Sequence, residues 1–210
     1  MPVVLLVRHG QASFGADDYD VLSDLGRRQG EVVGAELARR GLREPVSVSG
    51  GLRRQQDTAL LALPGTPLSV DRRWDEYDHL GLLQRYPSAE PSDGSSRSVQ
   101  VLLDAALRSW VDDPDGGWDA FAGGAAAALH DLVGDLGSGL DAVVVTSGGV
   151  VAAVCAGLLG LGADGVVALN RVTVNGGITK LVVGRGGVSL VAFNDHAHFE
   201  GASRELLTYR

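Results

Sequence analysis

The chain has 210 residues, of which 45% are hydrophobic and 21% are charged, and its formal net charge at pH 7 is -8. This length and composition fit one globular domain and exclude a wholly disordered chain. The negative net charge argues against a general nucleic-acid-binding protein, which usually carries a basic patch, although a local arginine cluster can still bind a small anion.

The single cysteine, Cys155, lies in an apolar run. One cysteine excludes an internal disulfide and a thiolate metal cluster, and we interpret this one as a buried, unreactive thiol. The apolar run before Arg8 is too short for a signal sequence or a membrane span. We therefore expect a cytoplasmic protein with no membrane partner.

The first part of the chain alternates between strand and helix patterns. Residues 3–7 form a short, continuous apolar run rich in valine and leucine, which is typical of a strand buried on both faces. Ser23 is a suitable N-cap for a helix over residues 24–40, and Gly41 follows its end. We then expect a strand at 46–49, a helix at 52–63 and a brief strand at 68–70.

The second part continues this alternation after a loop-like stretch at 87–98. We expect helices at 99–112 and 118–136, a strand at 142–146, a helix at 150–159, and a hairpin of two strands at 178–183 and 188–193. Alternating strands and helices indicate an α/β fold with a mostly parallel sheet. We expect a single domain over residues 1–210, with an insertion or lid at about 75–118 that lies over one end of the sheet.

Polar residues follow three of the expected strands at the point where each strand ends. They are Arg8-His9-Gly10-Gln11, Arg53-Arg54 and Ser147-Gly148-Gly149. Ligands of open α/β sheets bind beyond the carboxyl ends of the strands, so the topology brings these three segments to one edge. Positive charge is unfavourable at a helix N-terminus, so at least one arginine of the pair needs an anionic partner. We expect Arg54 to be the arginine that binds an anion, and Arg53 to face solvent.

These residue types suit phosphoryl transfer. Arginine binds a phosphate dianion through a planar fork, and a neutral imidazole is a competent nucleophile near pH 7. The leaving alkoxide needs a proton, which a carboxylic acid of raised pKa can supply. Arg8, His9, Arg54 and Glu76 could fill these roles, although Asp75 or Asp78 could be the acid instead.

The chain resembles the histidine phosphatase (phosphoglycerate mutase-like) superfamily over nearly its whole length. Each motif alone is weak evidence, but several in the family's order are strong evidence. The matching segments are Leu6-Val7-Arg8-His9-Gly10-Gln11, Leu22-Ser23-Asp24-Leu25-Gly26-Arg27-Arg28-Gln29, Leu52-Arg53-Arg54-Gln55-Gln56-Asp57-Thr58-Ala59, Trp74-Asp75-Glu76 and Thr146-Ser147-Gly148-Gly149-Val150.

The resemblance implies a three-layer α/β/α sandwich and a metal-independent phosphatase of the histidine acid phosphatase type, with no cofactor. It implies that His9 is the nucleophile and carries a phosphohistidine intermediate, that Arg8 and Arg54 bind phosphate, and that Glu76 is the general acid. The substrate would be a small phosphorylated metabolite, and the reaction would be hydrolysis of a phosphomonoester.

Two positions depart from the family pattern. The second pocket histidine of the family is replaced by Ser147, and its asparagine six positions after the nucleophile is replaced by Gly15. Ser147 and the Gly148 backbone N–H could still donate to phosphate, and Gln11 or Ser13 could replace the asparagine. His198 is a further candidate for the lost histidine.

Two other functions stay open, and the departures at Ser147 and Gly15 favour the first of them. One is a catalytically weak relative that binds a phosphorylated ligand as a sensor. The other is a phosphotransferase of the phosphoglycerate mutase type, which needs a closed basic pocket to retain the phosphoryl group. The 75–118 region has no dense basic cluster near Glu76, so hydrolysis is favoured over transfer.

Overall fold

The computed structural model of the chain describes residues 1–13, 20–88, 95–137 and 139–209. Its centre is a six-stranded sheet in the order β3-β2-β4-β1-β5-β6. The strands are β1 (Val3–Arg8), β2 (Val46–Ser49), β3 (Leu68–Val70), β4 (Ala142–Thr146), β5 (Ile178–Gly184) and β6 (Gly187–Asp195).

Four of the strands form a parallel unit. β1 pairs in parallel with β4, and β2 pairs in parallel with both β4 and β3. β5 pairs antiparallel with β1 and with β6, so the last two strands form a hairpin at one edge. In the register, Arg8 lies opposite Thr146 and Ser49 opposite Val145. The segments that follow β1, β2 and β4 therefore start from one edge of the sheet.

The alternation of side chains along each strand divides the core into two apolar clusters. Val4 and Leu6 of β1 belong to one cluster, and Leu5 and Val7 belong to the other. Because successive residues of a strand point to opposite faces, a continuous apolar run supplies both clusters at once.

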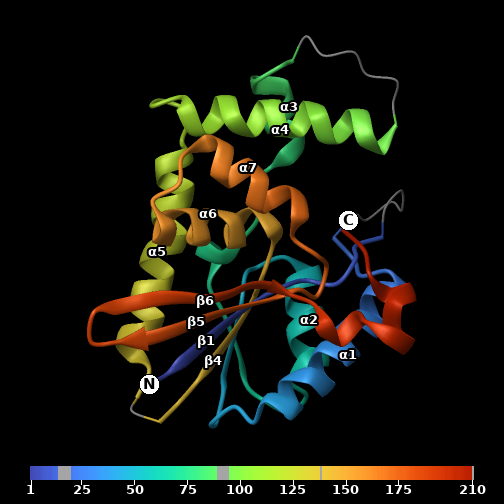
Figure 1. Ribbon diagram of the computed structural model, residues 1–210, viewed down its shortest axis with the longest axis vertical. Helices are drawn as coiled ribbons and strands as arrows, with labels where there is room; N and C mark the ends of the chain where they lie inside the picture. Colours follow the sequence, from blue (N-terminus) through green and yellow to red (C-terminus); the bar gives the residue numbers. More distant parts are fainter. Residues whose placement is uncertain (14–19, 89–94, 138, 210) are drawn as a thin grey trace.

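Helices cover both faces of the sheet, so the fold is a three-layer α/β/α sandwich (Figure 1). Helices α1 (Asp24–Arg40) and α2 (Arg53–Ala62) pack on one face together with the 3-10 helices η2 (Ala197–Phe199) and η3 (Gly201–Leu206). Helices α5 (Trp118–Asp135) and α6 (Gly148–Leu159) pack on the other face.

A third group of helices lies beyond α6. Helices α3 (His79–Arg85), α4 (Ser96–Asp112) and α7 (Ala163–Val172) form the upper part of the molecule in Figure 1. An apolar cluster that includes Leu107, Trp110 and Val167 joins them. The 3-10 helix η1 (Arg72–Trp74) connects β3 to this region.

The structure confirms the α/β class, the mostly parallel sheet and the three-layer architecture. Helix α1 has the expected bounds, with the Ser23 side chain accepting from the Gly26 N–H and Gly41 in the left-handed conformation at its end. The sequence analysis missed α3 and α7. Helix α7 has only ten residues, contains Gly165 and has no side-chain cap, so its pattern is weak. No helix among the described residues is long and apolar enough to cross a membrane.

Candidate active site

His9 directly follows β1 at the carboxyl edge of the sheet and is buried, with 6% of its surface exposed. Its backbone is fixed on both sides: the His9 N–H donates to the Thr146 carbonyl at 2.8 Å, and Asn175 Nδ2 donates to the His9 carbonyl at 3.1 Å. The ring Nδ1 lies 2.6 Å from the Gly10 carbonyl oxygen. Because a carbonyl oxygen only accepts, this nitrogen carries a proton.

Arg54 lies in the first turn of α2, and its Nε donates to His9 Nε2 at 3.1 Å. Because an arginine Nε only donates, His9 Nε2 must offer its lone pair, and the ring is the neutral tautomer with the proton on Nδ1. Burial lowers the pKa of His9 well below its usual range, and the positive charges of Arg54 and Arg8 lower it further. The histidine is therefore held in the neutral form.

Arg8 is the last residue of β1, and its guanidinium is held by backbone carbonyls from two other segments. Nη1 donates to the Tyr209 carbonyl at 2.8 Å and to the Thr173 carbonyl. A Cβ added to Gly148 would lie 3.5 Å from Arg8 Nε. The N-terminus of α6 therefore packs directly against this arginine, as expected for segments that share one sheet edge.

Glu76 is half-buried after η1 and accepts two backbone N–H groups. Its Oε2 accepts from Gly149 at 3.1 Å, and its Oε1 accepts from Tyr77 at 3.2 Å. Burial raises the pKa of Glu76, although these two hydrogen bonds and the charges of Arg8 and Arg54 oppose the shift. A raised pKa suits a group that must be protonated before it donates.

The other two candidate acids have structural contacts. Asp75 accepts from the Gly51 N–H through Oδ1. Asp78 is the N-cap of α3 and accepts from the N–H groups of Leu80 and Gly81, each at 3.1 Å. The charges of Arg8 and Arg54 both lower the pKa of Glu76 against the effect of burial, which shows that this carboxylate lies near the two arginines.

Ser147 is fully buried at the N-cap position of α6, with 0% of its surface exposed, and makes no side-chain cap bond. Its Oγ accepts from Gln55 Nε2 at 2.9 Å, and the same amide donates to the Trp74 carbonyl at 3.0 Å. Gln55 therefore links α2 to the N-terminus of α6. The sequence analysis did not identify Gln55, although it lies in the motif beside Arg54.

The remaining candidates lie around these residues. Gln11 Oε1 accepts from Ser23 Oγ at 3.0 Å, and the Ser13 N–H donates to the Val21 carbonyl at 2.7 Å. Gly15 lies outside the described residues. The described contacts of His198 are with Gly176 and Phe199 rather than with the His9 ring.

Arg53 is exposed and Arg54 is buried with 8% of its surface exposed, as expected. Among the described residues Arg54 forms an ion pair with Asp20, which was not predicted from the sequence. Asp20 Oδ1 lies 2.7 Å from Arg54 Nη1, and Asp20 Oδ2 accepts from the Arg53 N–H at 2.8 Å. Asp20 is distant from α2 in the sequence, so no local pattern connects the two.

The family model described as "Histidine phosphatase superfamily (branch 1)" matches residues 4–196. The chain is 35% identical over 183 residues to a protein of Mycolicibacterium vanbaalenii named glucosyl-3-phosphoglycerate phosphatase, and the match covers 77% of this chain and 76% of that protein.

Solved structures of the same fold cover most of the chain. YhfR of Bacillus stearothermophilus matches with a TM-score of 0.73 and 19% identity, covering 95% of this chain and 100% of that one. A mycobacterial glucosyl-3-phosphoglycerate phosphatase in complex with inorganic phosphate matches with a TM-score of 0.66 and 24% identity, covering 94% and 99%. A phosphoserine phosphatase of Entamoeba histolytica in complex with 3-phosphoglyceric acid matches with a TM-score of 0.66 and 19% identity, covering 94% and 99%.

Proposed function

The chain belongs to branch 1 of the histidine phosphatase superfamily, and from this premise we propose that it is a metal-independent phosphomonoester hydrolase with a phosphohistidine intermediate on His9. The observation that carries the proposal is the contact between Arg54 Nε and the lone pair of His9 Nε2 at 3.1 Å. This contact places a cationic donor at the point where the nucleophile must meet phosphorus.

In the first step, His9 Nε2 attacks phosphorus, and an N–P bond forms as the bond to the leaving oxygen breaks. The phosphoryl group takes the place that Arg54 Nε occupies beside the lone pair. The Arg54 Nε–H then donates its hydrogen bond to a phosphoryl oxygen instead of to His9. Arg8 lies close by, and the N-terminus of α6 packs against it. Both stabilise the remaining negative charge of the phosphoryl group. The hydrogen bond from Nδ1 to the Gly10 carbonyl keeps the ring oriented throughout.

Glu76 supplies the proton that the leaving oxygen needs. Its raised pKa favours the carboxylic acid, while the Gly149 N–H holds the group in one orientation. In the second step a water attacks the phosphohistidine, the N–P bond breaks, and Glu76 accepts a proton from the water. Inorganic phosphate leaves, and both residues return to their starting states.

We propose further phosphate donors around this centre. The Ser147 Oγ already accepts from Gln55, so its hydroxyl proton is available to donate. The Gly148 N–H lies at the N-terminus of α6, whereas the Gly149 N–H is bound to Glu76. Gln11 and Ser13 complete the proposed set. A serine in place of histidine leaves one neutral donor, which lowers the expected turnover without removing the nucleophile.

The substrate is proposed to be a small phosphorylated metabolite. The relative from Mycolicibacterium vanbaalenii is named for glucosyl-3-phosphoglycerate, so this ester belongs in a substrate screen together with phosphoserine and 3-phosphoglycerate. That relative is named as a phosphatase, which supports hydrolysis over phosphoryl transfer between sugar acids.

The test is turnover of p-nitrophenyl phosphate in EDTA by wild type, His9→Ala and His130→Ala. His130 is exposed on α5 and serves as the matched control. We expect turnover in wild type and His130→Ala, none in His9→Ala, and acid-labile phosphate trapped on the protein only where His9 is present. Phosphate-ester binding without turnover in wild type would instead support a sensor. Activity that survives His9→Ala would refute the proposed nucleophile.

A further inference from the structure

The Asp20 carboxylate contacts two points on the first turn of α2. Its Oδ1 lies 2.7 Å from Arg54 Nη1, and its Oδ2 accepts the backbone N–H of Arg53 at 2.8 Å. The Asp20 side chain is 31% exposed, whereas the Arg54 side chain is 10% exposed. A partly exposed carboxylate thus reaches a guanidinium that is buried against His9.

Helix α2 needs this partner because its first turn contains no acidic residue. The N-cap residue is Leu52, whose side chain makes no cap bond, and the first turn has two arginines and no acidic residue. Positive side chains at a helix N-terminus add to the positive end of the macrodipole. Asp20 comes from another segment and supplies the missing negative charge. Its carboxylate also accepts from the backbone N–H of Arg53, which has no acceptor within the helix.

The two contacts of Arg54 lie on different nitrogens of one planar group. Nε donates to His9 Nε2 at 3.1 Å, and Nη1 donates to Asp20 Oδ1 at 2.7 Å. A planar guanidinium held at both nitrogens has a defined rotation about its own axis. On the basis of the proposed function, we propose that Asp20 is a positioning residue that keeps Arg54 beside His9 through Nη1 while the Nε–H exchanges the His9 lone pair for a phosphoryl oxygen.

This role has a kinetic signature that a purely structural role lacks. A carboxylate near the site repels the phosphate dianion, so it weakens ground-state binding of anions. Its benefit comes from preorganisation, which acts on the transition state. Loss of the charge should therefore lower kcat while inorganic phosphate binds as well as before or more tightly.

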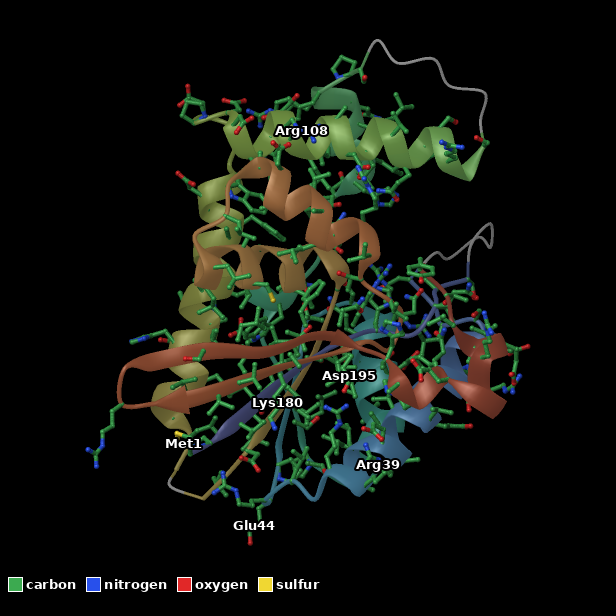
Figure 2. The ribbon with its side chains drawn as sticks, viewed as in Figure 1. Met1, Arg39, Glu44, Arg108, Lys180 and Asp195 are labelled. Atoms are coloured by element: carbon green, nitrogen blue, oxygen red, sulfur yellow. The ribbon has the colours of Figure 1, made fainter. Side chains whose placement is uncertain are left out.

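The experiment compares Asp20→Asn with wild type and with Asp164→Asn. Asp164 pairs with Arg108 at 2.8 Å and lies in the first turn of α7, so it is a matched carboxylate–arginine pair at another helix start. Figure 2 labels Arg108 on α4, in the helical layer beyond α6. Measured quantities are kcat and KM for p-nitrophenyl phosphate, the inhibition constant of inorganic phosphate, the melting temperature and hydrogen exchange at the Arg54 Nε–H. Arg54→Lys identifies the NMR signal of that group.

For Asp20→Asn we expect kcat to fall about tenfold or more, which corresponds to about 1.4 kcal/mol. We expect an inhibition constant for phosphate that is equal to or lower than that of wild type, and faster exchange at Arg54 Nε. Asp164→Asn should match wild type in all three. The proposal would be overturned if folded Asp20→Asn had an unchanged or raised kcat, or unchanged hydrogen exchange at Arg54 Nε. A fall in kcat that is fully explained by partial unfolding of the variant would also overturn it.

His9→Ala in the same series separates the two proposals. Wild-type turnover that requires His9, together with an unaffected Asp20→Asn, overturns the role of Asp20 and leaves the hydrolase intact. Absence of turnover in wild type overturns both proposals.

Discussion

Gly149 is the residue at which the smallest side chain should do the most damage to the site. A Cβ at this position would lie 2.3 Å from Glu76 Oε1 and 2.3 Å from Tyr77 Cε1, which is closer than real Cβ contacts allow. The Tyr77 ring is packed against Trp110 and Phe121, with ring centroids 5.4 Å and 5.9 Å away. Because the ring has little room, Gly149→Ala should displace the Glu76 carboxylate instead.

The displacement has two costs. Overpacking of a buried site typically costs about 1–3 kcal/mol, and loss of the hydrogen bond from Gly149 to Glu76 costs about 0.5–1.5 kcal/mol more. A positioned general acid contributes about 10²–10⁴ in rate, so a misplaced Glu76 should slow alkyl esters about a hundredfold. Aryl esters, whose phenoxide leaves without a proton, should lose less than about tenfold.

The assay compares kcat/KM for β-glycerophosphate and for p-nitrophenyl phosphate. Gly157→Ala on the same helix is the matched control, because a Cβ there meets no atom within 4 Å. That variant should keep its activity and gain about 0.5–1 kcal/mol from helix propensity. Equal losses on the two esters in Gly149→Ala, or no loss on either, would refute the assignment of Glu76 as the acid held by Gly149.

Three further predictions follow from the pKa shifts and the buried contacts. Since burial and the two neighbouring arginine charges lower the pKa of His9, kcat/KM should fall with acid only below about pH 6.5; alkyl esters should also slow at higher pH as Glu76, whose pKa is raised, loses its proton. A pH–rate profile in which the acid limb lies at or above pH 6.5 argues against this. Two arginine partners hold the pKa of Glu36 at about 2. The ionised Glu36 carboxylate stabilises the folded protein at any pH above the pKa that Glu36 has in the unfolded chain. Urea melts should therefore show Glu36→Gln to be about 1–3 kcal/mol less stable than wild type at pH 7, with the difference closing between pH 4.5 and pH 2. A difference that is constant with pH would contradict the ion pairs. Ser147→Ala leaves one buried Gln55 N–H without its acceptor, so it should cost about 1–3 kcal/mol of stability and weaken vanadate inhibition by less than tenfold; unchanged inhibition would remove Ser147 from the phosphate contacts.

The elements with strong local signals were predicted well from the sequence. The run Val3–Val7 supplies both apolar clusters, so its composition alone indicates a strand covered on two faces. Ser23 and Gly41 mark the two ends of α1 through their caps. Helix α7 escaped prediction because Gly165 and three valines weaken a ten-residue pattern that packing against α4 and α6 stabilises.

The site divides in the same way. Arg8 and His9 are adjacent and follow a strand, so one motif and one rule of sheet topology place them. The contacts that orient them come from distant segments: Asn175 donates to the His9 carbonyl, and Arg8 is held by carbonyls of Thr173 and Tyr209. A backbone carbonyl exists at every residue, so a sequence pattern cannot indicate which ones a guanidinium will use.

Arg54 shows how far a physical argument can reach without a structure. The macrodipole of α2 requires an anion near its two arginines, and this requirement holds whatever residue meets it. We expected the phosphate of a substrate to be that anion, but the structure provides the Asp20 carboxylate at 2.7 Å. Helix α2 therefore has the anion that its charge requires, and this anion comes from the protein itself. A phosphate that enters the site meets an arginine that is already paired and oriented, so the arginine contributes direction to the reaction as well as charge.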